Sequence, residues 1–107
     1  MTGAPVRGQV WEYVQGSRQH RVLIVSSDEY NEHPNALPWA LVLERGAPSV
    51  PGFLVPLAAD DPLPGAAVVV PRVVRCDPSA LRHCLGYLGN ASLNAVERGL
   101  RELLNLP

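Results

Sequence analysis

A histidine and an arginine, His20 and Arg21, stand next to each other at the end of a short polar segment. This segment, Gln15–Arg21 (QGSRQHR), contains two arginines, one histidine, one serine and two glutamines. An imidazole carries protons near neutral pH, and a guanidinium donates paired hydrogen bonds that match the oxygens of a phosphate. Because polar loops held between strands often carry function, we expect the functional site in this segment.

Two apolar runs flank this segment and predict a β-hairpin. Strands are expected over Val6–Val14 and Arg21–Ser27, with the polar segment as the loop between them. Neighbouring side chains point to opposite faces along a strand. His20 therefore has to lie in the loop, outside the second strand, if it is to act on the same ligand as Arg21.

The rest of the chain is predicted to supply the scaffold for this hairpin. A polar turn that can hold one helical turn is expected over Asp28–Asn35, further strands over Ala36–Glu44, Gly52–Leu57 and Ala66–Arg75, and connectors over Arg45–Pro51 and Ala58–Gly65. Pro71 predicts that the strand over Ala66–Arg75 is bent or divided in two. A short helix is expected to start at Asp77-Pro78 and to end before Gly86, with Leu81, Cys84 and Leu85 facing inward.

A long amphipathic helix is predicted for the C-terminal segment, from Ser92 to Asn105, with Asn90 or Ser92 as its cap. Its apolar residues recur at spacings of three and four and are expected to pack on a sheet: Leu93, Val96, Leu100, Leu103 and Leu104. Its other side offers the ion pairs Glu97–Arg101 and Arg98–Glu102. Together the segments predict a mainly β fold, a small barrel of about five to seven strands with a short and a long helix.

Length and composition narrow the class of protein. The 107 residues are expected to form one domain, 1–107, and 47% hydrophobic residues with 18% charged residues are typical of a globular chain. The net charge of −1 excludes coating of nucleic acid through bulk charge, although a local basic site remains open. No apolar run approaches the roughly 20 residues of a membrane span, and no signal segment is evident. We therefore expect a cytoplasmic protein without a membrane partner.

The two cysteines, Cys76 and Cys84, lack the short spacing of a zinc or redox motif. We expect both to be buried free thiols. No metal ligand set and no cofactor is predicted.

Two N-terminal motifs resemble those of a known family. Arg7–Tyr13 (RGQVWEY) resembles the opening strand RGDVW of the MazF/PemK/Kid toxins of bacterial toxin–antitoxin operons, and Arg21–Asn31 (RVLIVSSDEYN) resembles their RPVLVVSNDxxN segment. The order of the later elements extends the resemblance over the whole chain. It implies an SH3-like barrel that forms a homodimer and cleaves single-stranded RNA or mRNA sequence-specifically without metal. It also implies a cognate antitoxin peptide whose extended acidic tail blocks the site.

The resemblance also implies roles for particular residues. Arg21 falls on the catalytic arginine of the family, and Gln19 and His20 lie in the corresponding loop. Cleavage requires a base for the 2′-OH proton, an acid for the 5′-oxygen and a cation for the phosphorus centre, and it yields a 2′,3′-cyclic phosphate and a 5′-OH. We expect Arg21 to stabilise charge, His20 to carry one proton, and Glu44, or alternatively Asp28, to carry the other. The side chains expected to contact RNA are Trp11, Ser17, Arg18, Gln19, Arg72 and Arg75.

Departures from the family pattern support an alternative hypothesis. The loop lacks the Glu of many relatives, Leu43–Gly46 (LERG) stands where many carry Thr or Ser, and Pro71-Arg72 replaces an acidic residue and Gln. The same barrel can therefore be a binding module that has lost its chemistry and acts on a protein partner, as the related CcdB fold acts on gyrase. A third hypothesis is an unrelated small barrel within a larger complex.

Overall fold

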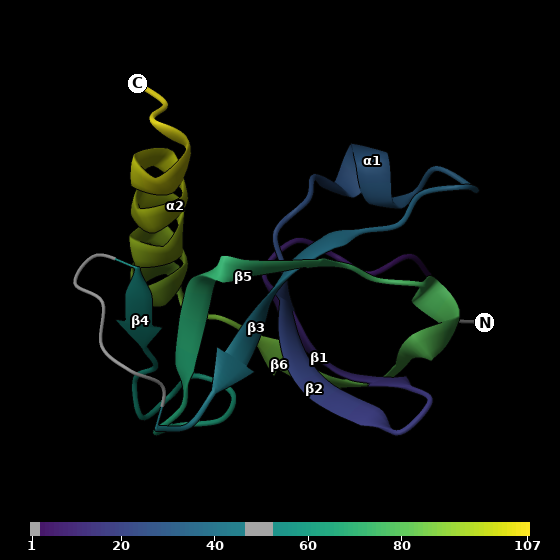
Figure 1. The fold of residues 1–107 in the computed structure, drawn as a ribbon, viewed down its shortest axis with the longest axis horizontal. Coiled ribbons are helices and arrows are strands. Elements are labelled where there is room, and N and C mark those ends of the chain that lie inside the picture. The colour runs from purple at the N-terminus through teal and green to yellow at the C-terminus, as the bar shows by residue number, and fades with distance from the viewer. Residues whose placement is uncertain (1–2, 47–52) are drawn as a thin grey trace.

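The computed structural model describes residues 3–46 and 53–107, and β-strands dominate it (Figure 1). Within these residues one antiparallel sheet has the strand order β4-β5-β3-β2-β1-β6. The strands are β1 (Gln9–Gln15), β2 (Arg18–Ile24), β3 (Trp39–Glu44), β4 (Leu54–Pro56), β5 (Ala67–Arg75) and β6 (Leu81–Tyr87). The helical elements are α1 (Asp28–Asn31), the 3₁₀ turn η1 (Pro78–Ala80) and α2 (Asn90–Leu104). The predicted mainly β fold with a C-terminal helix is confirmed.

The connection between β1 and β2 is much shorter than predicted. Gln15 pairs with Arg18, so only Gly16 and Ser17 form the turn. Gly16 has a φ of 62°, which suits a tight hairpin turn whose twist matches that of the flanking strands. The prediction of a seven-residue loop is wrong, because the polar residues 18–20 are paired within β2.

β5 is the bent strand that the sequence predicts. It pairs with β3 along two stretches, and the register shifts between Leu41 and Val42. Pro71 lies in the part of β5 that this shift leaves out of the ladder, where its missing N–H costs no hydrogen bond. The sheet curls at this bend, and Figure 1 shows β5 turning from the side of β4 across β3.

The short helix predicted after Asp77 is mostly wrong. Asp77 does start a helical turn, accepting a hydrogen bond from the Ser79 backbone N–H at 3.0 Å, but the turn is over after η1. The following residues form β6 and pair with β1. Without β6 the outer edge of β1 would leave its backbone groups unpaired, and this pairing overrides the local helix signal. Cys84 is therefore exposed instead of buried, whereas Cys76 is fully buried, and burial raises the pKa of its thiol to about 12.

Two apolar clusters lie on opposite faces of the sheet. Cluster 1 lies between the sheet and α2 and contains Val10, Leu23, Leu41, Leu43, Val55, Leu57, Ala66, Val68, Val70, Leu88 and Val96. Cluster 2 fills the other face and contains Tyr13, Val22, Ile24, Ala40, Val42, Cys76 and Ala80. Successive residues of β2 alternate between the two clusters, as strand geometry requires. The alternation decides which face each polar residue of the hairpin occupies.

α2 begins two residues earlier than predicted and is capped differently. Gly89 occupies the cap position and makes no side-chain cap bond, so the expected cap by Asn90 or Ser92 is wrong. Glu97 pairs with Arg7 at 3.2 Å, not with Arg101. Val96 is fully buried and Leu100 packs on cluster 1, but the helix extends past the sheet, as Figure 1 shows.

One further prediction is confirmed, and another falls on residues that the structure does not describe. One helical turn was expected within Asp28–Asn35, and α1 confirms it, with Ser27 as its cap. The connector predicted over Arg45–Pro51 and the start of the strand predicted at Gly52 fall largely outside the described residues. No helix in the described part of the chain is long and apolar enough to cross a membrane.

Candidate functional site

The tight hairpin separates the two side chains that the sequence places next to each other. His20 pairs with Tyr13, whose side chain belongs to cluster 2. Arg21 pairs with Leu43, whose side chain belongs to cluster 1. Directly paired residues share a face of the sheet. His20 and Arg21 therefore point to opposite faces of β2, and the expectation that a loop brings them together is wrong.

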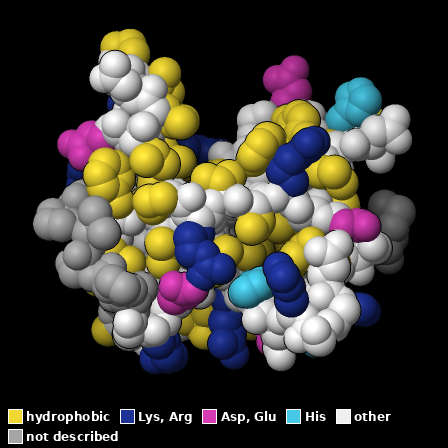
Figure 2. All heavy atoms as spheres, in the orientation of Figure 1, with side chains coloured by type: hydrophobic (Ala, Val, Ile, Leu, Met, Phe, Trp, Pro, Cys, Tyr) yellow, Lys and Arg dark blue, Asp and Glu magenta, His cyan; other side chains and the backbone are white. Residues whose placement is uncertain are grey.

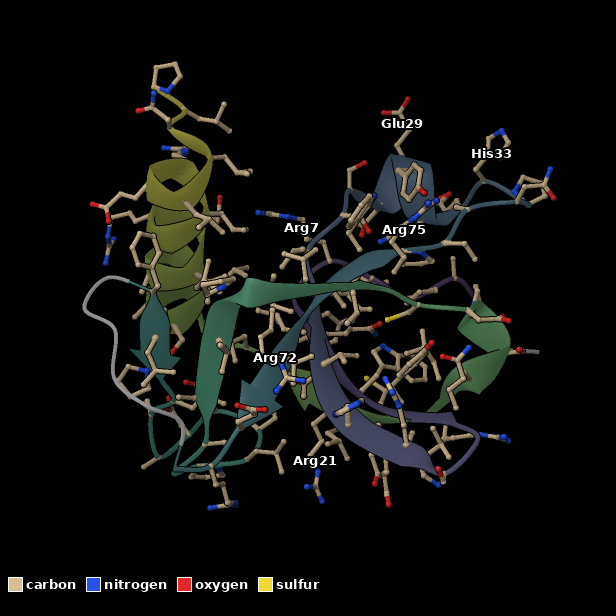
Figure 3. All side chains as sticks on the ribbon, in the orientation of Figure 1. Arg7, Arg21, Glu29, His33, Arg72 and Arg75 are labelled. Carbon is tan, nitrogen blue, oxygen red and sulfur yellow. The ribbon has the colours of Figure 1, made fainter. Side chains whose placement is uncertain are left out.

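Glu44 lies on the same face as His20. The pairing of Arg21 with Leu43 places the next residue of β3, Glu44, across from His20. The carboxylate of Glu44 forms an ion pair with the guanidinium of Arg72. Figure 3 shows Arg72 projecting toward the viewer from the bend of β5. This face therefore carries a possible proton carrier, a carboxylate and a cation close together.

A pocket next to this group is lined by residues of β1, β2 and β5. It has a volume of about 240 Å³ and is lined by Tyr13, Gln15, Arg18, His20, Val74 and Arg75. We call it the basic pocket. Arg75 only borders this pocket, because its guanidinium lies over the ring of Trp39, 5.2 Å from the centroid, and Figure 3 shows Arg75 close to α1. Among residues 3–46 and 53–107, no carboxylate forms a salt bridge with Arg18 or Arg75.

Arg21 lies at the same end of the sheet but on its other side. It is exposed and lines a small cavity of about 30 Å³ with Leu43, Glu44 and Arg45, closed by Leu63 and Ala66. Figure 3 shows its side chain directed away from the body of the molecule. Glu44, the last residue of β3, contacts groups on both sides of the sheet. It lines the cavity of Arg21, and its carboxylate pairs with Arg72. Figure 2 shows arginine, histidine and acidic side chains gathered over this part of the surface, below β5.

The remaining predicted residues have identifiable partners or positions. Trp11 is half-buried against cluster 2, and its indole N–H donates to Gln9 Oε1 at 3.0 Å. Gln19 donates to Glu12 Oε2 at 3.4 Å, and Ser17 lies in the exposed turn. Asp28 accepts from the Arg7 backbone N–H at 2.7 Å in α1, at the opposite end of β2. Asp28 is therefore badly placed to be the second proton carrier.

Sequence reasoning missed an apolar groove beside α2. The groove has a volume of about 510 Å³ and is lined by Val25, Ser26, Trp39, Leu41, Val73, Leu100, Leu103 and Leu104. Leu104 is 60% exposed and Trp39 42%, although burial was predicted for Leu104. Figure 2 shows hydrophobic side chains along α2 and on the strands beside it. The sequence did contain a signal for this groove. The apolar residues of α2 continue to its last turn, beyond the part of the helix that the sheet covers.

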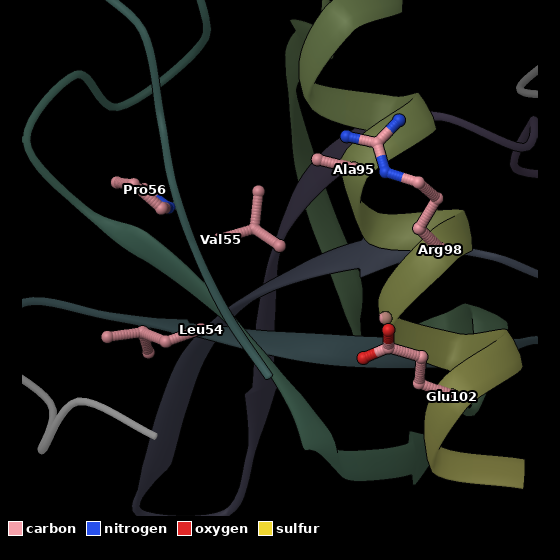
Figure 4. A pocket seen from close by; sticks show the side chains of 7 residues that line it. Leu54, Val55, Pro56, Ala95, Arg98 and Glu102 are labelled. Atoms are coloured by element: carbon pink, nitrogen blue, oxygen red, sulfur yellow. The ribbon is translucent and has the colours of Figure 1, made fainter. Parts of the chain in front are cut away.

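A second cavity lies far from the hairpin. A cavity of about 250 Å³ lies between β4 and α2 (Figure 4), and Arg98 and Glu102 are its charged residues. β4 is an edge strand of the sheet, and two strands, β5 and β3, separate it from the β1–β2 hairpin. In residues 3–46 and 53–107, no group of three or more His, Cys, Asp or Glu side chains is arranged to hold a metal ion.

Comparison with known proteins gives the family. Residues 7–104 match the model of the PemK-like, MazF-like toxin of type II toxin–antitoxin systems. An endoribonuclease solved with its cognate antitoxin, from a mycobacterial species, is 29% identical with a TM-score of 0.87 over 97% of this chain and 98% of that chain. A mycobacterial endoribonuclease is 27% identical with a TM-score of 0.85 over 100% of this chain and 97% of that chain.

A more distant structure supports the fold alone. A MazE–MazF complex from Deinococcus radiodurans is 21% identical with a TM-score of 0.83, covering 99% of this chain and 100% of that chain. A comparison with curated protein sequences gives no match. Since the family model spans nearly the whole chain, the protein belongs to the PemK-like, MazF-like toxin family of type II toxin–antitoxin systems.

Proposed function

We propose that this protein is a metal-independent, sequence-specific endoribonuclease that cleaves single-stranded RNA and is neutralised by a cognate antitoxin. Family membership supports the proposal, as do the two similar structures described as endoribonucleases, one of them in complex with its antitoxin. The observation that carries it is the position of Glu44, between the His20–Arg72 face and the cavity of Arg21. We place its action in the cytoplasm, where its proposed substrate is found.

The chemistry requires two proton transfers and a cation. In our proposal His20 and Glu44 move the protons, one accepting the 2′-OH proton and the other donating a proton to the 5′-oxygen as its bond to phosphorus breaks. The 2′-oxygen forms the new bond to phosphorus, so the products are a 2′,3′-cyclic phosphate and a 5′-OH. Arg21 is the proposed cation that stabilises the charge on the phosphoryl oxygens. Because its side chain leaves the face of β2 opposite His20, it has to reach this phosphate past the end of β3, where Glu44 lines its cavity. Arg72, which pairs with Glu44, is the alternative cation on the face of His20.

RNA binding is proposed for the polar surface around these residues. Ser17, Arg18, Gln19, Arg72 and Arg75 are the proposed contacts, and Trp11 adds the exposed part of its half-buried ring. An acidic antitoxin segment would be attracted to the same arginines by charge complementarity. Antitoxin binding and RNA binding would then exclude each other.

A homodimer is proposed through the apolar groove. Contiguous exposed apolar surfaces are a recurring feature of protein interaction sites. A second copy brings its own Leu103 and Leu104, so the same groove and the same exposed leucines can cover each other around a two-fold axis.

RNA cleavage in the presence of a chelator tests the proposed activity. Purified protein is incubated with mixed single-stranded RNA oligonucleotides and EDTA, and fragments ending in a cyclic phosphate and a 5′-OH are expected. Arg21→Ala should lower the cleavage rate roughly 100–1000-fold, the loss typical of one charge-stabilising donor. Arg101→Ala, on the exposed side of α2, is the matched control and should cleave normally.

The outcomes of this assay are distinct. Intact RNA with the wild-type protein would favour the alternative of a binding module without chemistry. Unchanged cleavage by Arg21→Ala would remove Arg21 from the mechanism and leave Arg72 as the nearer cation.

A further inference from the structure

We propose that Glu12 and His83 move the two protons of the cleavage, on the face of the sheet that carries Arg21. This inference rests on the proposed function and names a second pair of groups for its proton transfers, an alternative to His20 and Glu44. The reason for a second pair is the arrangement of β2. His20 and Arg21 point to opposite faces of this strand, so a phosphate bound by Arg21 lies on the face that His20 does not share.

A row of three polar side chains crosses β2, β1 and β6. Glu12 of β1 is paired with Arg21 of β2 on one side and with His83 of β6 on the other. Directly paired residues share a face of the sheet, with their Cβ atoms about 4.5–5.5 Å apart. The three side chains therefore lie next to one another in the order Arg21, Glu12, His83. Their face is that of cluster 1, because Val10 and Leu23, each two residues away along its strand, belong to this cluster.

The row is accessible to a ligand. Arg21 and His83 are exposed, and Glu12 is half-buried. In the described part of the chain, no salt bridge involves any of these three side chains. The side-chain amide of Gln19 donates to Glu12 Oε2 at 3.4 Å, which helps to orient the carboxylate. The row therefore presents a cation, a carboxylate and an imidazole on one open surface.

These three groups match the three requirements of the proposed cleavage. The carboxylate of Glu12 accepts the 2′-OH proton as the 2′-oxygen forms its bond to phosphorus. The imidazolium of His83 gives its proton to the 5′-oxygen as the bond from phosphorus to that oxygen breaks. Arg21 donates hydrogen bonds to the non-bridging phosphate oxygens, where negative charge accumulates. Exchange with water afterwards removes the proton from Glu12 and restores the one on His83.

The position of the cation distinguishes this pair from His20 and Glu44. Arg21 has to reach past the end of β3 to act with Glu44, whereas Glu12 is its direct neighbour on β1. The local sequence does not indicate the row, because His83 reaches it only through the pairing of β6 with β1, and a helix was expected there.

Cleavage by Glu12→Gln and His83→Gln in the presence of EDTA tests the pair. Each variant should cleave single-stranded RNA roughly 100–10,000-fold more slowly than the wild type, the range for loss of one general acid or base. Binding of 2′-O-methylated RNA and the circular dichroism spectrum should be unchanged, which separates a chemical role from a structural one. Glu29→Gln and His33→Gln are the matched controls and should cleave normally, because both residues are exposed and Figure 3 shows them near α1, away from Arg21.

A sulfur leaving group identifies which residue donates the proton. The substrate carries sulfur in place of the 5′-oxygen at the bond that the wild type cleaves. A thiolate leaves without being protonated, so the need for a general acid is removed. His83→Gln should therefore cleave this substrate within about tenfold of the wild-type rate, whereas Glu12→Gln should remain slow. A side chain with a purely structural role would not show this selective recovery.

The possible outcomes separate this inference from the proposed function. If the wild type cleaves RNA and both variants cleave equally well, the inference is overturned and the nuclease proposal stands. Slow variants that the sulfur substrate restores equally, or not at all, would also overturn it. Recovery of Glu12→Gln alone would support the pair with the two roles exchanged. If the wild type cleaves no RNA, the proposed function fails and the inference fails with it.

Discussion

At the scale of single residues, Glu44 is the side chain on which the proposed chemistry depends most. It is the last residue of β3, it lines the cavity of Arg21, and its carboxylate pairs with Arg72. The ion pair keeps the carboxylate in place on the face of His20.

Glu44→Gln tests the role of this carboxylate. The amide keeps the size of the side chain but cannot accept or donate the proton, so cleavage should fall roughly 100–10,000-fold. Binding of 2′-O-methylated RNA should be retained, which separates chemistry from affinity. Glu102→Gln, an exposed carboxyl of α2, is the control. Normal cleavage by Glu44→Gln would assign both proton transfers to groups other than Glu44.

At the scale of elements, Asp61 joins the loop before β5 to the start of α2. The carboxylate accepts from the backbone N–H groups of Ala58 and Gly89, both at 2.8 Å, and from Ser92 Oγ at 2.5 Å. It thereby ties the cap residue Gly89 and the first turn of α2 to this loop. Burial by itself would raise the pKa of Asp61, but the hydrogen bonds from Ser92, Gly89 and Ala58 hold the pKa below its usual value.

The lowered pKa has a defined consequence for stability. A carboxyl whose pKa is lower in the folded state stabilises the fold above its unfolded pKa of about 3.9, and this contribution is lost as the pH falls through the folded pKa. Asp61→Asn should therefore lower the free energy of unfolding by about 1.5–3 kcal/mol at pH 7, the range for hydrogen bonds to charged groups. The difference from the wild type should shrink below about pH 4.

Urea unfolding at pH 7 and at pH 3 measures both effects. Asp60→Asn, at the exposed neighbouring position, is the control. An Asp61→Asn variant as stable as the wild type at pH 7 would show that these hydrogen bonds are not needed to hold α2.

At the scale of the whole molecule, the exposed end of α2 is the basis of the proposed dimer. The helix is longer than the sheet that it covers, so Leu103 and Leu104 continue its apolar face beside Trp39 and Val73. Apolar burial contributes roughly 25 cal/mol per Å². A second copy that covers this groove would gain that contribution on both sides of a two-fold axis.

A double substitution of the two leucines tests the proposed dimer. The wild type should have twice the mass of the chain by light scattering, and Leu103→Glu with Leu104→Glu should have the mass of one chain with an unchanged circular dichroism spectrum. Leu106→Glu is the control, because Leu106 is exposed but does not line the groove. A dimer that survives the double substitution would place the interface elsewhere.

Local sequence patterns determined much of this protein. The motifs Arg7–Tyr13 and Arg21–Asn31 indicated the family, and the alternating apolar runs indicated a mainly β chain with a bent strand at Pro71. The spacing of leucines indicated α2. These features depend on residues close together in the chain, so the sequence carries them directly.

Tertiary structure alone decided three further features. β6 is a strand because β1 offers it an unpaired edge, although its own residues favour a helical turn. His20 and Arg21 lie on opposite faces because the turn has two residues, and the length of a turn decides which residues of a strand face which side. Leu103 and Leu104 are exposed because the sheet ends before the helix does. Each depends on a pairing or a boundary set by distant parts of the chain, which local periodicity does not record.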